Sequence, residues 1–437
     1  MGAYGLSVAV FALAFAYLGI GVWVFAGVLL VGVSSQFLLL DFPLERIAAL
    51  ARASMFRSAT SWELSALPLF IWMGEIVFRT DVAERLFRGL SPIANRVPGR
   101  LLHTNVAGCT LFGAVCGSSA ATAATVGKIT TTAFSQRGYN LDLSIGSLAA
   151  AGSLGLLIPP SIVMIVYGVV AEVSIAKLFI AGFVPGFVIS AVFSSYVMLR
   201  CWLRPDLAPV ETGHAVSGPQ AVRAMLDLWP VILLVGVVMG AIYTGVATPT
   251  EAAAVGVAIT FAIALVTRQL TWTLLRESSM AAVRSSCMIM AIMIAAALLS
   301  TTLAYLHIPT DLARLVQSSG LGPYHLILAI GLLYLMLGCF LDGVSITVMT
   351  IPVVLPLVTA AGFDPIWFGI FLIVMVELGQ ITPPVGFNLF VLQGLTGQPL
   401  ARVAWAAAPF GVLMMTCLAV FTIWPGIVLW LPNLLQP

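Results

Sequence analysis

The chain has 437 residues, of which 61% are hydrophobic and only 8% are Asp, Glu, Lys or Arg. An average soluble domain carries about 25% charged residues, so this composition excludes a water-soluble fold, and the apolar excess also excludes disorder. A formal net charge of +2, with no run of like charges, argues against a nucleic-acid partner. The chain therefore belongs in a lipid bilayer.

The cysteines and histidines give no sign of a cofactor. The six cysteines and four histidines show neither CxxC nor Cys/His ligand spacing, and most of the cysteines lie inside apolar runs. An intramembrane enzyme would need a Ser/His/Asp set or a pair of carboxylates at one depth in the membrane, and the sequence places no such set there. We expect no organic cofactor and no enzymatic activity. The N-terminus has no basic n-region, and no small-residue cleavage site interrupts the apolar stretch that follows. This favours a retained membrane span over a signal peptide.

Charged residues divide the chain into membrane spans, because each costs several kcal/mol at mid-bilayer and a span needs about 20 apolar residues. A further apolar segment, Leu64 to Phe78, carries only Glu75. The charge-free stretches are continuous and do not alternate with period two, so they predict an all-α polytopic membrane protein and exclude a barrel. These stretches are Met1 to Leu40, Leu101 to Gly127, Leu143 to Ala171, Leu178 to Leu199, Leu228 to Thr250, Ala252 to Thr267, Ser285 to Thr310, Leu315 to Leu341, Gly343 to Phe363, Leu378 to Ala401 and Val403 to Pro437.

Two segments between the spans have the pattern of helices lying along the membrane surface. Pro43 to Phe56 and Leu270 to Met280 each carry apolar residues on one side and charged residues elsewhere. We expect one such surface helix in each half of the chain.

The two halves of the chain repeat one another. The Pro-Pro pair at Pro159 recurs at Pro383, 224 positions later, in the same place of the hydropathy pattern. We therefore predict a first repeat at 1–205, a cytoplasmic linker at 206–223 and a second repeat at 224–437. Further matches are Gly138 with Gly362, Pro185 with Pro409, and the motif GCTLFG (Gly108 to Gly113) with GCFLDG (Gly338 to Gly343).

Arginine placement predicts that the repeats are inverted. The stretch from Arg79 to Arg100 carries five arginines, and the linker and the loop around Arg276 are also basic, so the positive-inside rule places them in the cytoplasm. The segments around Asp311 and Asp364 carry few basic residues and should lie outside. The chain then enters the first GC motif from the cytoplasmic side and the second from the outer side, so the two repeats have opposite orientations. The first surface helix, although basic, falls outside and departs from the rule.

The first repeat contains a predicted re-entrant helical hairpin at about 101–134. A cluster of small residues with Gly117, Ser118 and Ser119 at its centre has basic residues on both sides. Each arm of about 15 residues reaches only ~22 Å, which is shorter than the ~30 Å hydrocarbon core. Packing faces of small residues in crossing helices are the alternative, but they leave the two adjacent serines unexplained.

The second repeat contains the counterpart hairpin at about 325–359. Asp342 and Gly343 interrupt its apolar run, and an isolated carboxylate inside a membrane segment is a functional-site candidate. A neutral, hydrogen-bonded acid that serves packing is the alternative.

Two transmembrane helices are predicted to be broken, at about 143–171 and about 366–396. Consecutive prolines remove two backbone donors, so each helix unwinds there and leaves carbonyl groups without partners. Free carbonyls are tolerated in hydrocarbon only where they line a cavity or bind a ligand. A plain kink is the alternative, but it does not require Gly, Ser or Thr before both breaks.

The tips of the two predicted hairpins and the breaks in the two helices together predict a sodium site. Hard oxygen ligands of low total charge suit an alkali cation better than a divalent one, and helix N-termini at the tips suit an anionic substrate. Asp342 is the one formal charge of this predicted set. The hydroxyl and carbonyl candidates are Ser118, Ser119, Thr122, Ser153, Ser345 and Thr382.

Long motifs across essentially the whole chain resemble the large membrane subunit, the dicarboxylate-type M subunit, of tripartite ATP-independent periplasmic (TRAP) transporters. These are GSSAATAATVG, RGYNLDL, LIPPSIVMIVYGVVAEVSIAKLFIAGFVPG, TPTEAAAVGV, FLDGVSITVMTIPVVLP, TPPVGFNLFV and WPGIVLWLP. The resemblance implies an elevator-type fold, like that of the ion-transporter superfamily, in the bacterial inner membrane. It also implies a sodium-driven importer that takes an organic acid from a periplasmic substrate-binding protein and works with a separate small four-helix membrane subunit.

Residue by residue, the resemblance places sodium at the hairpin tips and helix breaks. The mapped residues are Gly117, Ser118, Ser119, Ser153, Asp342, Gly343, Ser345, Thr382 and Pro383. The substrate-contacting residues are not identified by it, and the candidates at the same tips and breaks are Ser119, Thr122, Pro159, Pro384 and Asn388. Where related sequences often carry Asn, this chain has Met375, followed by Glu377, which leaves the role of that stretch open.

A self-sufficient sodium- or proton-coupled transporter of anions or dicarboxylates, without a binding protein, is the alternative function. Adjacent genes for a secreted binding protein and a four-helix membrane protein would favour the tripartite system.

The topology of the first hairpin can be tested by cysteine labelling. Single cysteines introduced at Arg96 and at Arg137 are expected to react with a membrane-impermeant maleimide from the cytoplasmic side, because the arms between them are too short to cross the bilayer. Right-side-out and inside-out vesicles give the two readings. Labelling of the two positions from opposite sides would rule out the hairpin.

Overall fold

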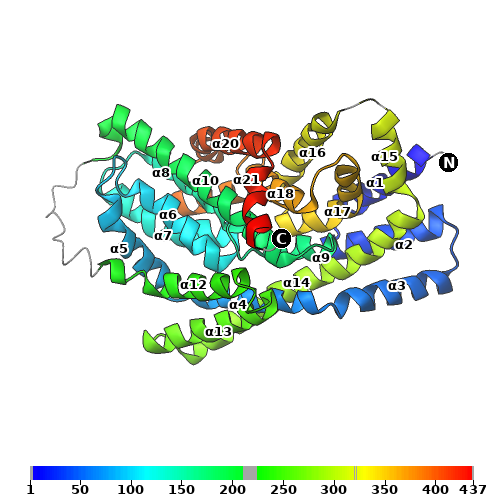
Figure 1. The fold of residues 1–437 in the computed structure, drawn as a ribbon, viewed down its shortest axis with the longest axis horizontal. Helices are drawn as coiled ribbons and strands as arrows, with labels where there is room; N and C mark the ends of the chain where they lie inside the picture. The colour runs from blue at the N-terminus through cyan, green and yellow to red at the C-terminus, as the bar shows by residue number, and fades with distance from the viewer. Residues whose placement is uncertain (1–2, 210–223, 319, 321, 436–437) are drawn as a thin grey trace.

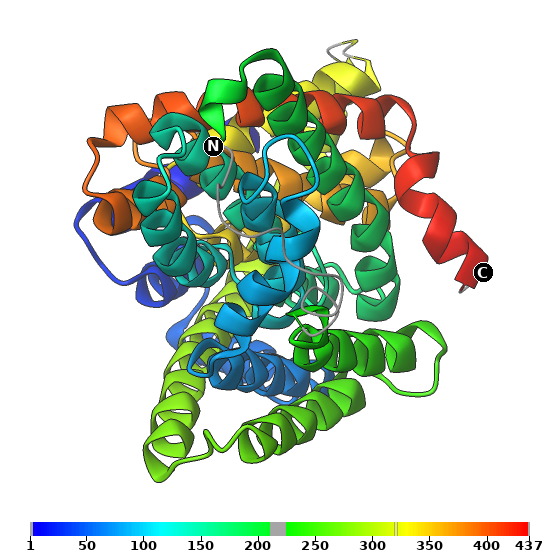
Figure 2. The same ribbon diagram turned by 90° about the vertical axis from the view of Figure 1, so that its left-hand side faces the viewer.

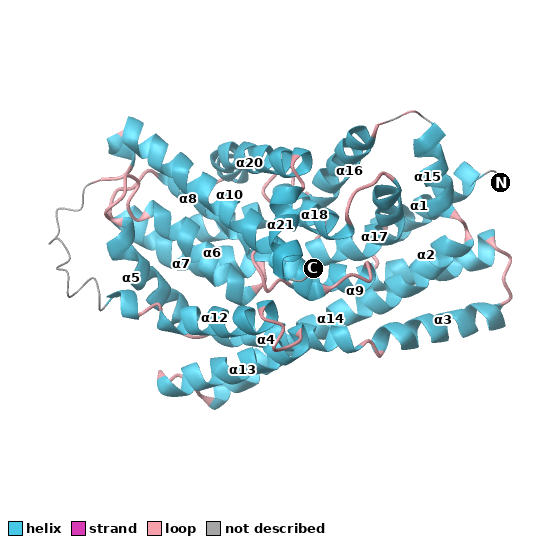
Figure 3. Ribbon diagram, in the orientation of Figure 1, coloured by secondary structure: helices cyan, strands magenta, loops and turns pink. Residues whose placement is uncertain are grey.

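The computed structural model describes residues 3–209, 224–318, 320 and 322–435. Over these residues the chain is a set of helices joined by loops, and no strand is present (Figure 3). Most of the predicted linker 206–223, from residue 210 onward, lies outside the described residues. The prediction of an all-helical protein is confirmed.

The described part of the first half contains α-helices and three short 3₁₀ turns, of which η2 lies at the first helix break. They are α1 (Ala3–Gly19), α2 (Val24–Leu39), α3 (Leu44–Ala59), η1 (Trp62–Ser65), α4 (Ala66–Phe78), α5 (Val82–Ala94), α6 (Leu102–Cys116), α7 (Ser119–Gln136), α8 (Leu141–Gly152), η2 (Ser153–Leu156), α9 (Ile162–Val170), α10 (Ile175–Leu203) and η3 (Pro205–Leu207).

The second half follows a similar order. Its helices are α12 (Trp229–Tyr243), α13 (Pro249–Val266), α14 (Trp272–Tyr305), α15 (Ile308–Ser318), α16 (Pro323–Gly338), α17 (Gly343–Ala360), α18 (Pro365–Gln380), α19 (Phe387–Thr396), α20 (Leu400–Ile423) and α21 (Gly426–Leu435). Among the described residues, 6 helices are long and apolar enough to cross a membrane by themselves. Shorter apolar helices such as α6 and α16 accompany them, as expected of a polytopic membrane protein.

The 224-residue repeat is visible in the helix boundaries. Helices α7 and α17 both have 18 residues and begin at Ser119 and Gly343, which are 224 positions apart. Helices α8 and α18 begin after the N-caps Asn140 and Asp364, which have the same spacing, and each side chain accepts hydrogen bonds from its own first turn. The local capping chemistry is therefore repeated together with the hydropathy pattern.

Close glycine contacts join the first arm of each helical pair to the broken helix of its own half. A Cβ added to Gly113 would lie 2.8 Å from the Cα of Gly155, and one added to Gly379 would lie 2.5 Å from the Cα of Gly338. Gly113 is thus the structural counterpart of Gly338. The pairing of GCTLFG with GCFLDG, which matched Gly108 to Gly338, is out of register because a short motif of small residues can align at more than one position in these arms.

One predicted element of the second half is wrong. The surface helix expected at Leu270 to Met280 is not separate, because α14 continues unbroken for 34 residues from Trp272 to Tyr305. No Gly or Pro occurs in that stretch to end the helix. Arg276 and Arg284 lie on its exposed side, so they need no break in the backbone to reach solvent.

The two helical pairs occupy opposite ends of the molecule. Figure 1 places α6, α7 and α8 toward one end and α16 and α17 toward the other, with α18 between them near the middle. Helix α13 lies along the lower edge in this view and in the view from the side, and α14 rises from beside it toward the middle of the molecule (Figure 2). The tips of both pairs consequently point toward the centre of the molecule.

A polar cluster joins the loop after α4 to the loop after α13. Arg85 Nε donates to the Asp81 carboxylate at 2.9 Å, and Gln269 Nε2 donates to the same carboxylate at 2.5 Å. Partial burial works to raise the pKa of Asp81, but the hydrogen bonds from Arg85 and Gln269 outweigh it and lower the pKa. Helices α4 and α13, which pack together, are therefore also fastened at this end.

The glycine contact in the second half predicts a steric cost for Gly379→Ala. The new methyl group would meet the backbone of Gly338, and overpacking of this kind costs roughly 1–3 kcal/mol. Gly394→Ala in α19 is the matched control, because nothing lies within 4 Å of its Cβ position. Thermal unfolding of the purified protein in detergent should show a lower midpoint for the first variant only. Equal midpoints would mean that the contact is not this close.

Candidate functional site

The turn between α6 and α7 contacts the break between η2 and α9. Gly117 adopts φ +60, a left-handed conformation that favours glycine. A Cβ at Gly117 would lie 3.0 Å from the carbonyl oxygen of Pro160. The tip of the first helical pair therefore needs glycine both for its turn and for its approach to the Pro159-Pro160 segment.

The turn between α16 and α17 contacts the second break in a related way. The Gly386 N–H donates to the carbonyl oxygen of Cys339 at 3.1 Å. The Cys339 thiol lies 3.5 Å from the carbonyl oxygen of Pro383. Backbone groups beside the second pair of prolines are thus met by the tip of the same half.

The two halves also meet across the site. The Ser119 hydroxyl, at the start of α7, donates a short hydrogen bond to Glu377 Oε1 in α18. A Cβ at Gly343, at the start of α17, would lie 3.1 Å from Val163 and 3.4 Å from Leu156 of the first half. Both tips and both breaks therefore converge on one region.

The predicted hydroxyls of the first half differ in what they have available for a ligand. Ser153 is completely buried, but its hydroxyl donates to the Ala150 carbonyl at 2.7 Å, within its own helix. Ser118 is the N-cap of α7 and accepts from Ala121 N at 3.5 Å. Thr122 is completely buried and its hydroxyl has no partner among the described residues. Thr122 and Ser119 are thus the hydroxyls directed at other parts of the site.

Asp342 forms a hydrogen-bonded turn with α17. It is exposed and is the N-cap of this helix, accepting from Val344 N at 3.1 Å and Ser345 N at 3.2 Å. The Ser345 hydroxyl donates to its other oxygen at 2.5 Å. Asp342 therefore caps α17, whether or not its carboxylate also faces a cation.

The Thr382 hydroxyl, just before the second break, donates to the Leu378 carbonyl at 2.5 Å.

The two breaks differ in exposure. Pro159 and Pro160 are buried, whereas Pro383 and Pro384 are exposed. Asn388, which follows the second break, is completely buried, and neither its amide oxygen nor its amide nitrogen has a partner among the described residues. The site is closed at the first break and open at the second.

Glu377 is a functional candidate whose role the sequence left open. It is completely buried, its Oε1 accepts from Ser119, and its Oε2 has no partner within the described part of the chain. Asp342 is consequently not the one carboxylate near the tips. The 224-residue spacing was the signal available, since it places Glu377 opposite Ser153, already a candidate.

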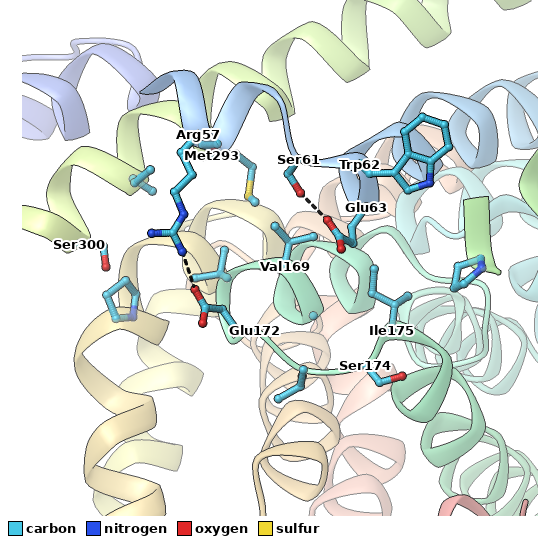
Figure 4. A pocket seen from close by; sticks show the side chains of 18 of the residues that line it. Arg57, Ser61, Trp62, Glu63, Val169, Glu172, Ser174, Ile175, Met293 and Ser300 are labelled. Atoms are coloured by element: carbon cyan, nitrogen blue, oxygen red, sulfur yellow. Dashed lines mark hydrogen bonds and ion pairs between the residues drawn. The ribbon is translucent and has the colours of Figure 1, made fainter. Parts of the chain in front are cut away.

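A cleft of about 840 Å³ separates the α3 and α14 side of the molecule from α9 and α17. Figure 4 shows Arg57 from α3 directed at Glu172, at the turn after α9, and the ion pair spans 3.5 Å. Both side chains are at least 80% exposed, so the pair contributes roughly 0–1 kcal/mol. The cleft is therefore only weakly bridged by these charges.

Comparison with known proteins identifies relatives along nearly the whole chain. A family model described as "Tripartite ATP-independent periplasmic transporter, DctM component" matches residues 8–427. The C4-dicarboxylate TRAP transporter large permease protein DctM of Pseudomonas aeruginosa is 34% identical over 405 residues, covering 92% of this chain and 93% of that protein.

A fused relative and a solved structure extend the comparison. The isethionate TRAP transporter permease protein DctMQ of Oleidesulfovibrio alaskensis is 31% identical over 388 residues, which cover 89% of this chain and 60% of that protein. The crystal structure of the YdaH transporter of Alcanivorax borkumensis is similar with a TM-score of 0.56 at 14% identity, covering 83% of this chain and 86% of that one. At this identity the structural likeness concerns the fold alone.

The cap geometry of Asp342 predicts a difference between two substitutions. Asn caps a helix as well as Asp, so Asp342→Asn should unfold close to the parent in sodium-free buffer, whereas Asp342→Ala should lose roughly 0.5–2 kcal/mol. Thermal unfolding in choline chloride measures both. An equal loss in the two variants would show that charge, and not capping, stabilises this turn.

Proposed function

We propose, because the chain belongs to the DctM component family of tripartite ATP-independent periplasmic transporters, that it is the transport subunit of a sodium-coupled importer of organic acids. Members of this family are multi-pass permeases of the bacterial inner membrane, so the chain is a transporter and not an enzyme. The convergence of two tips and two helix breaks on one buried polar region is the observation that carries the proposal.

Sodium is the proposed coupling ion because the converging segments offer neutral oxygens and few charges. Hydroxyl and carbonyl oxygens, with one hydrogen-bonded carboxyl group at each tip, suit a monovalent hard cation. Sodium is transported cargo in this proposal. The residues proposed to hold it are Gly117, Ser118, Ser119, Ser153, Asp342, Gly343, Ser345, Thr382 and Pro383.

An organic acid is the proposed substrate. The relatives named above are named for C4-dicarboxylates and for isethionate, which are organic anions. Helices α7 and α17 begin at the two tips, and helix N-termini favour negative charge without needing Lys or Arg. Substrate contacts are proposed among Ser119, Thr122, Pro159, Pro384 and Asn388, of which Thr122 and Asn388 have buried polar atoms without partners in the described structure.

Two partner proteins are proposed, a small four-helix membrane subunit and a periplasmic substrate-binding protein. The family is named for a tripartite transporter, and the name DctMQ joins two components in one relative. The exposed apolar side chains on α3, including Leu44 and Phe56, suit contact with lipid or with a membrane partner.

An elevator movement is the proposed mechanism, in which the tips and breaks of both repeats move together against a scaffold. The cleft lined by α3 and α14 on one side and by α9 and α17 on the other supports it. The Arg57–Glu172 pair across the cleft is exposed and can separate at little cost. The repeated helix order of the two halves supports alternating access to one central site.

Uptake into proteoliposomes that contain the chain and its small subunit, with the binding protein added, tests the function. C4-dicarboxylates and isethionate are the first substrates, each assayed under a sodium gradient and under a potassium gradient. We expect uptake that requires sodium and the binding protein. Equal uptake without the binding protein would favour the self-sufficient transporter, and equal uptake in potassium would contradict sodium coupling.

Asp342→Asn adds a residue-level test in the same assay. A charge pair in a partly hydrated site at an effective dielectric constant near ~20 contributes a few kcal/mol, so we expect the half-saturating sodium concentration to rise at least about tenfold. Asp364→Asn is the matched control, because it removes a capping carboxylate from the start of α18, away from both tips. Superimposable sodium curves for parent and Asp342→Asn would exclude Asp342 from a cation site.

A further inference from the structure

Glu377 is a carboxyl group held inside the protein without a basic partner. It lies in the last turn of α18, is completely buried, and forms no ion pair with a Lys, Arg or His of the described residues. Its Oε2 has no hydrogen-bond partner there either. Burying a carboxylate in this way is costly unless a positive charge compensates it.

The contact of Glu377 with Ser119 breaks the symmetry of the repeat. At the 224-residue spacing, Glu377 corresponds to Ser153 and Ser119 corresponds to Gly343. The reciprocal pair would be Ser153 with Gly343, which has no carboxylate, and the Ser153 hydroxyl is bonded within its own helix. The Ser119–Glu377 contact is therefore not a by-product of duplication.

Each helical tip nevertheless has one carboxylate. The second tip carries its own, Asp342, whose counterpart in the first tip is the neutral Ser118. The first tip receives its carboxylate from the other half of the chain, through the hydrogen bond from Ser119 to Glu377. Each tip thus has one carboxyl group that is hydrogen-bonded to a serine of that tip, and both carboxyl groups come from the second half of the chain.

The hydrogen bond defines the direction of the Ser119 hydroxyl when Glu377 is ionised. An ionised carboxylate only accepts, so the Ser119 proton then points at Glu377 and the oxygen lone pairs are left for another group. The hydroxyl of Thr122, one turn further along α7, is buried and unpartnered, and a Cβ at Gly155 would lie 2.9 Å from it. Two hydroxyl oxygens at the start of α7 are therefore available beside a buried negative charge.

We propose that Glu377 is the anionic partner of a monovalent cation held at the tip between α6 and α7, and that it acts through Ser119 as a positioning residue. The carboxylate orients the Ser119 oxygen toward the cation and compensates its charge. This inference rests on the proposed sodium coupling and assigns to Glu377 a role that Asp342 has at the other tip.

The test compares two substitutions that separate charge from hydrogen bonding. Glu377→Gln keeps an acceptor oxygen for Ser119 but loses the charge, and Glu377→Met keeps most of the volume but loses both. We expect the half-saturating sodium concentration to rise at least about tenfold in the first variant and further in the second. Asp227→Asn is the matched control, because Asp227 is a partly buried carboxylate that is paired with Arg88 at 3.5 Å and lies beside α5, away from both tips.

Sodium-dependent stabilisation provides a readout that does not require transport. A bound ion raises the unfolding midpoint according to its concentration relative to its dissociation constant. The rise in midpoint from choline to sodium chloride, at constant ionic strength, should move to higher sodium concentration in both Glu377 variants and stay unchanged in Asp227→Asn. The shift is read within each variant, so a lower absolute stability of Glu377→Met does not affect it.

A double variant tests whether Glu377 acts through Ser119. Ser119→Ala combined with Glu377→Met should require about the same sodium concentration as the more impaired single variant, because both substitutions remove the same Ser119–Glu377 interaction. Additive effects would overturn the positioning role, and unchanged sodium responses in both Glu377 variants would overturn the inference as a whole. If the parent itself shows no sodium response, the proposed coupling fails first, and the two failures are therefore distinguishable.

Discussion

Irregular backbone in an apolar environment must find its hydrogen-bond partners inside the protein, and the centre of this molecule is built around that requirement. Two helices are interrupted by consecutive prolines, and two further pairs of helices end in tight turns. The turns meet the breaks: Gly386 donates to the carbonyl of Cys339, and Gly117 approaches the carbonyl of Pro160. Glycine at these contacts allows the backbones to come close enough.

The close approach of backbones explains the glycine pairs in the arms. Gly113 with Gly155, and Gly338 with Gly379, bring each first arm against the broken helix of its own half. A side chain at any of these positions would separate the arm from the break and leave polar backbone groups without partners. The same constraint therefore determines both the packing of the arms and the place where the turns meet the breaks.

Duplication provides two similar frameworks, but their chemistry has diverged. The first break is buried and the second is exposed, and the carboxyl groups that bond to the serines of the tips, Asp342 and Glu377, come from the second half. The first half contributes hydroxyls, of which Ser119 reaches across to Glu377. The junction of the halves thus combines hydroxyl groups from one half with carboxyl groups from the other.

Local properties of the sequence determined the membrane class, the repeat spacing and the positions of the breaks, because hydropathy, capping residues and proline act over a few residues. The family was also recognisable from motifs along the chain. The continuity of α14 could not be read from charge spacing, since Arg276 and Arg284 reach solvent from an unbroken helix. Only the tertiary structure decided which polar atoms are already satisfied: the Ser153 hydroxyl is used within its own helix, whereas Ser119 finds Glu377 across 258 residues. Such partnerships depend on how distant helices pack, and a pattern confined to neighbouring residues does not contain that information.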